Sequence, residues 1–180
     1  MDDSTERSVA SHYAHGTLEE TIIGALRTIG RSRDGLSIED LAPVEEYHIR
    51  GREATRELLS WTSPTAGSRV LDVGCGIGGA CRFIADRYGA TVTGIDLSAE
   101  YCRVAEQLSA YVGLNNLTSF HQETALAMPF ADEQFDLALS LRVQMNIRDK
   151  QGYFEEIERV LSSGGALALY EICSGSRSPV

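Results

Sequence analysis

A glycine-rich segment constrains the fold of this chain more than any other feature. Residues 70–79 read VLDVGCGIGG and meet the G-x-G-x-x-G spacing through Gly74, Gly76 and Gly79. The apolar run Arg69–Val73 predicts a buried strand before the glycines, and a helix-spaced run follows them. Glycines in that position allow a tight turn and a close approach of the backbone to a ligand. The pattern indicates a nucleotide-type ligand, and the alternative is an ordinary strand-to-helix turn.

Strands and helices then alternate to the end of the chain. Further strands are expected at Thr91–Asp96, Leu117–Gln122, Phe135–Leu141 and Ala166–Ile172. Helices are expected at Cys81–Tyr88, from the cap Ser98 to Val112, and at Asp149–Leu161, with Ser162–Gly165 ending the last one. This order predicts an α/β fold, a Rossmann-like parallel sheet with helices on both faces, and a ligand at the carboxyl ends of the strands.

The first part of the chain is expected to be a small helical front segment. Thr17 and Glu20 have the spacing of a reciprocal helix cap, and Ser37 with Asp40 is a second cap candidate. Pro43 is expected to interrupt the chain, and another helix is expected at about Arg52–Trp61. We therefore divide the chain into residues 1–62, on the lid or acceptor side, and a ligand-binding core at 63–180.

Side-chain burial can also be predicted from the pattern. Trp61 and the pair Tyr153 and Phe154 are expected in the core, whereas Glu45 and Glu46 are expected on a solvated face.

Composition excludes several classes of partner. Lys+Arg 16 against Asp+Glu 26 gives a net charge of −10, which disfavours nucleic acid and anionic membranes. No apolar run approaches the roughly 20 residues of a membrane-spanning helix, and the start of the chain lacks a signal-peptide pattern, so we expect a cytoplasmic protein. The four cysteines form no CxxC pair, so neither a disulfide framework nor a metal site is expected.

Two carboxylates bear on the identity of the ligand. Asp72 lies just before the first glycine, where it would repel the pyrophosphate of a dinucleotide and attract the ammonium and sulfonium of S-adenosylmethionine. Asp96 ends the second strand and could bind the ribose of either cofactor. Asp72 therefore favours S-adenosylmethionine.

At these residues the sequence resembles the class I S-adenosylmethionine-dependent methyltransferases. The resemblance is carried by VLDVGCGIGG, GIDLS (94–98), MPF (128–130), FD (135–136) and RVLSSGGALALYE (159–171). It is closer to the sarcosine and dimethylglycine type through LAPVEEYHIRGREAT (41–55) and QMNIRDK (144–150), and it extends from His12 to Ile172.

The resemblance implies a set of cofactor-binding residues. Asp72 and the backbone of Gly74 and Gly76 would cradle the methionine moiety, Asp96 would hold the ribose, and Leu97 would pack on the adenine.

After the third strand, where such families usually place an Asp, this chain has Thr124 beside Ala125. A hydroxyl in place of a carboxylate is expected to weaken cofactor binding by roughly 1 kcal/mol.

The resemblance also implies an acceptor side. At the end of the fourth strand, where relatives often show Gln-His, this chain has Leu141, on the cofactor side, and Arg142. Arg142 could hold a carboxylate of the acceptor in a bidentate fork, and the alternative is a solvent-facing loop arginine. His48, with Tyr47, could face the pocket as a catalytic group, and Tyr13 could belong to a lid over the acceptor.

The residues Gln144, Met145 and Asn146 follow and could line the acceptor side.

Relatives usually continue past the fifth strand with a last pair of strands, which this sequence lacks. The fifth strand is then an apolar edge, which we expect a second copy of the chain or another partner to cover. The expected activity is methyl transfer to a small-molecule acceptor, an amine nitrogen. The alternative is a methyltransferase-like protein that binds the cofactor without methylating and acts as a partner subunit or in another reaction.

Overall fold

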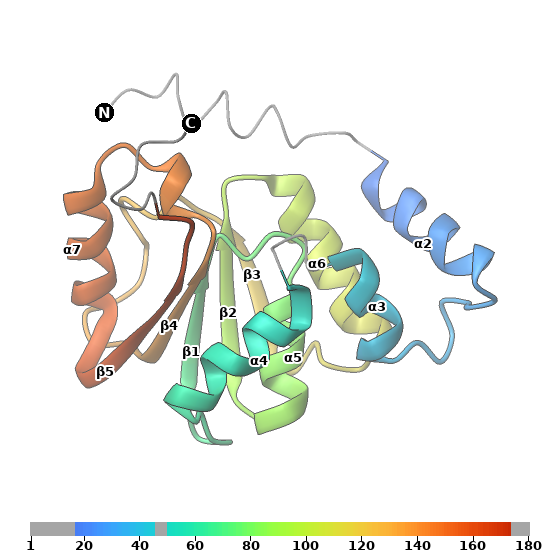
Figure 1. Cartoon of the computed structure of the whole chain (residues 1–180), viewed down its shortest axis with the longest axis horizontal. Helices are drawn as coiled ribbons and strands as arrows, with labels where there is room; N and C mark the ends of the chain where they lie inside the picture. Colours follow the sequence, from blue (N-terminus) through green and yellow to red (C-terminus); the bar gives the residue numbers. More distant parts are fainter. Residues whose placement is uncertain (1–16, 46–49, 174–180) are drawn as a thin grey trace.

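The predicted strands form one parallel sheet of five strands, in the order β3-β2-β1-β4-β5 (Figure 1). The computed structural model describes residues 17–45 and 50–173. The strands are β1 (Arg69–Val73), β2 (Thr91–Asp96), β3 (Thr118–Gln122), β4 (Phe135–Leu141) and β5 (Leu161–Tyr170). All four neighbouring pairs are parallel, so the carboxyl ends gather at one edge, at the top of Figure 1. The Rossmann-like α/β prediction is confirmed.

Helices pack on both faces of this sheet, as predicted. One face is covered by α4 (Gly51–Thr62), α5 (Gly79–Tyr88) and α6 (Ala99–Tyr111), and the other by α7 (Lys150–Val160). The strand residues alternate between the two: Val70 belongs to the core beneath α5, and Leu71 to the core beneath α7. Within residues 17–45 and 50–173, no helix is long and apolar enough to cross a membrane.

The front helices pack beside the glycine segment. They are α2 (Leu18–Thr28) and α3 (Ile38–Glu45), and Figure 1 shows them next to α6. Leu26 and Leu41 are fully buried in a cluster that also contains Ile77 of the glycine segment. The apolar faces of the front helices therefore bury part of the segment that follows β1.

Two predicted caps formed and one did not. Ser98 accepts a hydrogen bond from Tyr101 N at 3.3 Å, and Ser37 and Asp40 form the predicted reciprocal cap. The Thr17 prediction was wrong, since the Thr17 side chain makes no capping bond. The Glu100 carboxylate of α6 accepts from Leu18 N at 3.1 Å instead, a tertiary contact that local spacing does not reveal.

Pro43 does not interrupt the front segment but lies inside α3. A proline there removes one intrahelical hydrogen bond. The helix nevertheless continues to Glu45, where Leu41 and Glu45 are both buried.

The last strand begins earlier than predicted. Strand β5 starts at Leu161, directly after α7, so Ser162–Gly165 is part of the strand and not a separate turn. The register with β4 shifts between Phe135 and Leu137, and Gly164 has a positive φ of 82°. The glycines that suggested a turn accommodate this irregularity in the ladder.

Two burial predictions were wrong. Trp61 is 75% exposed near the end of α4, whereas Tyr153 is fully buried as predicted and Phe154 packs partly buried beside it. Glu45 is buried and not solvated, because its carboxylate forms ion pairs with two arginines. Glu46 lies outside the described residues.

Candidate active site

The glycine loop between β1 and α5 has a left-handed backbone at three alternate glycines. Gly74, Gly76 and Gly78 have φ values of 73°, 55° and 81°, a region that side chains with a Cβ rarely adopt. A Cβ on Gly78 would lie 2.7 Å from Phe120 Cε1. Gly79, predicted from the spacing, is instead the first residue of α5. The third turn glycine is therefore Gly78, and a G-x-G-x-G pattern would have identified it.

Hydrogen bonds from the end of β2 hold this loop. Gly74 N and Cys75 N both donate to the carbonyl of Ile95, at 2.8 and 2.9 Å. The Asp96 carboxylate accepts from Gly76 N at 3.0 Å and from Ser98 N at 2.9 Å. The structure therefore brings Asp96, Gly74 and Gly76 together.

The environment of Asp96 sets its protonation. Burial raises the pKa of the Asp96 carboxyl, and the backbone N–H groups of Ser98, Gly76 and Leu97 oppose this shift by stabilising the charged form. A carboxylate offers about four lone-pair sites, so three accepted bonds still leave room for a further donor. Asp96 can therefore accept hydrogen bonds from a ligand at the loop.

Asp72 lies in β1 directly before the loop, and its carboxylate faces α5. It is buried, and its Oδ2 accepts from the thiol of Cys81 in α5 at 3.2 Å. Burial raises the pKa of Cys81 to about 11, so the thiol keeps its proton at neutral pH and can donate. The Asp72 charge thus sits in a poorly solvated site, where it acts strongly on neighbouring charges.

The loop after β4 touches the glycine loop. A Cβ on Gly74 would lie 2.3 Å from Val143 Cγ2, so Val143 occupies the space that glycine leaves. Leu141 ends β4, and Arg142 follows it with a φ of 60° and donates its backbone N–H to the carbonyl of Tyr170 at 2.8 Å. Leu141 and Arg142 therefore lie at the same edge as the glycine loop.

The residues predicted to lie beside the adenine follow β2 and β3. Gln122 Nε2 donates to the carbonyl of Leu97 at 3.2 Å, which ties the end of β3 to that of β2. Leu126 N donates to Thr124 Oγ1 at 3.2 Å, and Ala125 packs partly buried between them. The Thr124 hydroxyl thus accepts a hydrogen bond from the backbone two residues further on.

A polar cluster beneath the acceptor side was not predicted. Tyr153 Oη donates to Ser140 Oγ at 2.6 Å, and both side chains are fully buried. Burial raises the pKa of Tyr153, the Ser140 hydrogen bond opposes the shift, and the charges of Glu171 and Asp72 add to it. Glu171 also accepts from Gln144 N at 2.7 Å. Such partners lie in different helices, strands and loops, so a linear pattern does not reveal them.

Other predicted acceptor-side residues have mixed outcomes. Gln144, Met145 and Asn146 form the short 3₁₀ helix η1 directly after Val143, with Met145 exposed. Tyr13, Tyr47 and His48 lie outside the described residues.

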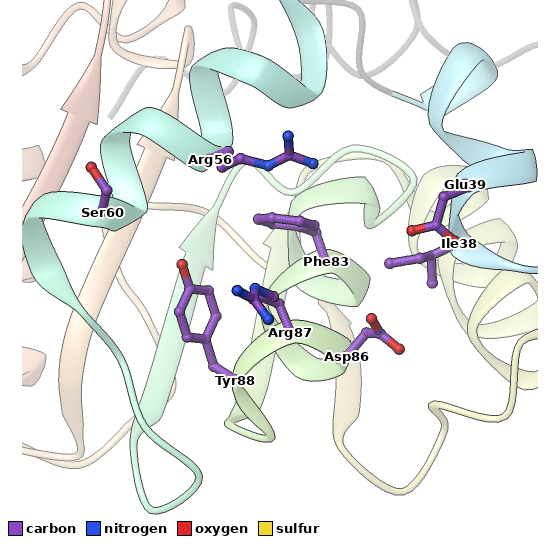
Figure 2. A pocket seen from close by; sticks show the side chains of 8 residues that line it. All are labelled: Ile38, Glu39, Arg56, Ser60, Phe83, Asp86, Arg87 and Tyr88. Carbon is purple, nitrogen blue, oxygen red and sulfur yellow. The ribbon is translucent and has the colours of Figure 1, made fainter.

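A groove of about 540 Å³ lies elsewhere, among α3, α4 and α5 (Figure 2). In Figure 2 the Arg56 guanidinium lies over the Phe83 ring, 5.8 Å from its centre. Arg56 and Arg87 in the lining are matched by Glu39 and Asp86, so the groove presents no net charge to select an ion. Of the predicted site residues that the structure describes, none lines this groove. The candidate active site therefore lies at the carboxyl ends of the strands, where the glycine loop follows β1.

Comparison with known proteins identifies the family. A family profile described as "Methyltransferase domain" matches residues 71–169, from β1 to the end of β5. The chain belongs to the class I S-adenosylmethionine-dependent methyltransferases. The glycine loop, Asp96 and the end of β4 all lie inside the segment that the family profile matches.

The chain matches only part of the length of individual relatives. It is 38% identical over 110 residues to ajmaline N-methyltransferase of Rauvolfia serpentina, which covers 61% of this chain and 38% of that protein. It is 31% identical over 176 residues to methyltransferase GfsG of Streptomyces halstedii, which covers 96% of this chain and 60% of that protein. The chain therefore spans less than two thirds of the length of each of these relatives.

A solved structure of a Galdieria sulphuraria protein, provisionally named a sarcosine dimethylglycine methyltransferase, shares the fold. Its TM-score is 0.62 at 23% identity, and the match covers 64% of this chain and 45% of that one.

Proposed function

We propose that this chain transfers the methyl group of S-adenosylmethionine to a small-molecule acceptor, an amine nitrogen. Family membership and the N-methyltransferase among its relatives support this proposal. The observation that carries it is the hydrogen bond from Gly76 N to the Asp96 carboxylate. A Cβ on Gly76 would meet nothing within 4 Å, so the space beside this glycine is open. That open face leaves room for a ligand to approach the backbone.

The residues present fit S-adenosylmethionine. Asp72 and Asp96 place two carboxylates beside the loop, which suits a donor that carries a sulfonium and an ammonium. In this proposal Asp96 binds the ribose hydroxyls, the charge of Asp72 and the backbone of Gly74 and Gly76 hold the methionine end, and Leu97 packs on the adenine.

Thr124, Ala125 and Leu141 complete the cofactor side. S-adenosylmethionine supplies a methyl group activated by the sulfonium charge.

The chain must then align an uncharged nucleophile with that methyl and exclude water. We assign Arg142 to hold a carboxylate on the acceptor, His48 to accept a proton from the amine, and Tyr13 to the lid. These roles favour an acceptor of the amino-acid kind, as in the sarcosine and dimethylglycine type, because a guanidinium binds a carboxylate in a bidentate geometry.

Calorimetry and a turnover assay test the proposal. S-adenosylhomocysteine is titrated into the full chain, and its release from S-adenosylmethionine is then followed with amines, amino acids and phenols. Binding with turnover on an amine or amino acid is expected. Turnover on phenols alone would overturn N-methylation, binding without any turnover would establish the non-methylating alternative, and absence of binding would reject both.

We also propose a partner at the sheet edge. Within the described residues, β4 is the one strand that pairs with β5, so the other side of β5 is open. Leu169 in β5 and Ile172 just after it are exposed. Open apolar edges invite pairing, so a second copy of the chain, or another partner, is expected to cover β5. A strict monomer in analytical ultracentrifugation at micromolar concentration would contradict a homodimer. A cytoplasmic location belongs to the same proposal, and cell fractionation tests it.

A further inference from the structure

A buried arginine connects the glycine loop to two helices. Arg82 lies in the first half of α5 and is fully buried. Its Nη2 donates to the carbonyl of Ile77 in the glycine loop at 2.6 Å and to Glu45 Oε2 of α3 at 2.6 Å. Its Nη1 donates to the carbonyl of Ala105 at 3.1 Å and to Ser109 Oγ at 3.2 Å, both in α6. One guanidinium thus joins the loop, α3 and α6.

A carboxylate of the front segment balances the buried charge of Arg82. Glu45 lies at the end of α3, and its side chain, like that of Arg82, has no exposed surface. The second oxygen of Glu45 accepts from Arg52 of α4 at 2.7 Å. A buried charge that loses its partner is strongly destabilised, so Glu45 compensates the charge of the guanidinium and holds it in place. Lysine could not substitute, because it lacks the planar fork of donors.

The side chain of Ile77 is held by the same helices. It is buried in the cluster formed by α2, α3 and α6, with Leu26, Leu41 and Leu108 among its members. The carbonyl of Ile77 is bound by Arg82, and the preceding residue, Gly76, is bound through its N–H by Asp96. The loop is therefore fixed at two consecutive residues, from the sheet on one side and from the front segment on the other.

We propose that Arg82 and Glu45 are positioning residues for cofactor binding, through which the front helix α3 sets the affinity of the glycine loop. This inference rests on the proposed function. Neither side chain needs to touch the cofactor, because Arg82 acts on the Ile77 carbonyl and Glu45 acts on Arg82. Loss of the link frees the loop backbone that Asp96 and the turn glycines would present to S-adenosylmethionine.

The first test is Glu45→Gln in the full chain, with S-adenosylhomocysteine affinity measured by calorimetry. Coupling between two parts of a protein changes affinity by about 5- to 150-fold, so we expect at least about fivefold weaker binding. In turnover, the KM for S-adenosylmethionine should rise while kcat at saturating cofactor stays near the wild-type value. Amide exchange should increase in the glycine loop and α3 and not in α7.

The matched control is Asp136→Asn. Asp136 forms an ion pair with Arg69 at 2.6 Å, at the edge of the sheet opposite the glycine loop. This control should bind S-adenosylhomocysteine as wild type does.

A double variant separates positioning from stability. Glu45→Leu with Arg82→Met removes the whole buried pair, a replacement that often leaves stability unchanged or improved. If Arg82 positions the loop, the double variant folds and still binds weakly, because the Ile77 carbonyl has lost its donor.

Wild-type affinity in the folded double variant would overturn the inference. So would failure of both variants to fold, since the pair would then serve folding alone. Absence of binding in the wild-type chain would reject the proposed function instead.

Discussion

Replacing Gly74 by alanine should destabilise the protein for two separable reasons. The φ of 73° at Gly74 is left-handed, which costs a residue with a Cβ roughly 1–2 kcal/mol. The new methyl would also lie 2.3 Å from Val143 Cγ2 and 2.9 Å from Val143 Cγ1, and overpacking of this kind costs roughly 1–3 kcal/mol. We therefore expect Gly74→Ala to lower the free energy of unfolding by roughly 2–5 kcal/mol.

The second variant, Val143→Ala, isolates the steric part. It removes both offending methyls and leaves Val143 Cβ, which would lie 3.2 Å from the new carbon. Val143 is only half buried, so Val143→Ala alone should cost less than about 1.6 kcal/mol, the value for two fully buried methyls. In the Gly74→Ala background the same change should recover about 1–3 kcal/mol, while the backbone cost remains.

Urea unfolding of the four proteins measures this cycle, and Gly76→Ala is the control. Gly76 also has a positive φ, but a Cβ there would meet nothing within 4 Å. Gly76→Ala should therefore cost only the backbone part, roughly 1–2 kcal/mol, while abolishing S-adenosylhomocysteine binding. The reasoning is wrong if Gly74→Ala unfolds within about 0.5 kcal/mol of wild type, or if Val143→Ala does not restore it.

Three further changes have defined outcomes. Asp96→Ala removes hydrogen bonds to a charged group, each worth about 1.5–3 kcal/mol, so calorimetry should show S-adenosylhomocysteine affinity about 10- to 150-fold lower. Tyr153→Phe leaves a buried Ser140 oxygen unpaired and should cost about 1–3 kcal/mol in urea unfolding, most of which Ser140→Ala restores. The hydrogen bonds from Arg69 lower the pKa of Asp136 from 3.8 to about 2, so this pair stabilises the folded state above pH 3.8 and the effect disappears as pH falls toward 2. Because the Asp136 side chain is 38% exposed, Asp136→Asn should cost less than about 1 kcal/mol at pH 7, and this cost should disappear once the pH is below the folded-state pKa of about 2.

The strands could be predicted because their signal is local. Arg69–Val73, Thr91–Asp96 and Phe135–Leu141 occur in the structure with the predicted bounds, since strands buried on both faces are continuous apolar runs. Caps such as Ser98 were predictable for the same reason, because the cap and the N–H it accepts from lie three residues apart. The cofactor edge followed from the fold, since parallel strands end together.

Burial of single side chains was less predictable. Trp61 is apolar but 75% exposed, because residues within one helix do not specify which face meets the sheet at its last turn. Thr17 and Glu20 have the spacing of a cap, yet Glu100 of α6 satisfies the helix N-terminus. In both cases a partner far along the chain decides the outcome.

The position of Arg82 in the sequence indicates a buried ion pair. It stands in a stretch of α5 whose other residues, Gly79 to Ala85, are all buried, and a charge in an apolar run must find a partner. The apolar run around Arg82 can be recognised in the sequence, but the partner of Arg82 cannot. Glu45 is 37 residues away, and the acidic residues beside it are typical of a solvated surface. A buried cation in the helix that follows a glycine loop therefore implies a carboxylate from another element, and here that carboxylate comes from the front segment. The front helices are consequently part of what shapes the loop, even though the family match begins only at residue 71.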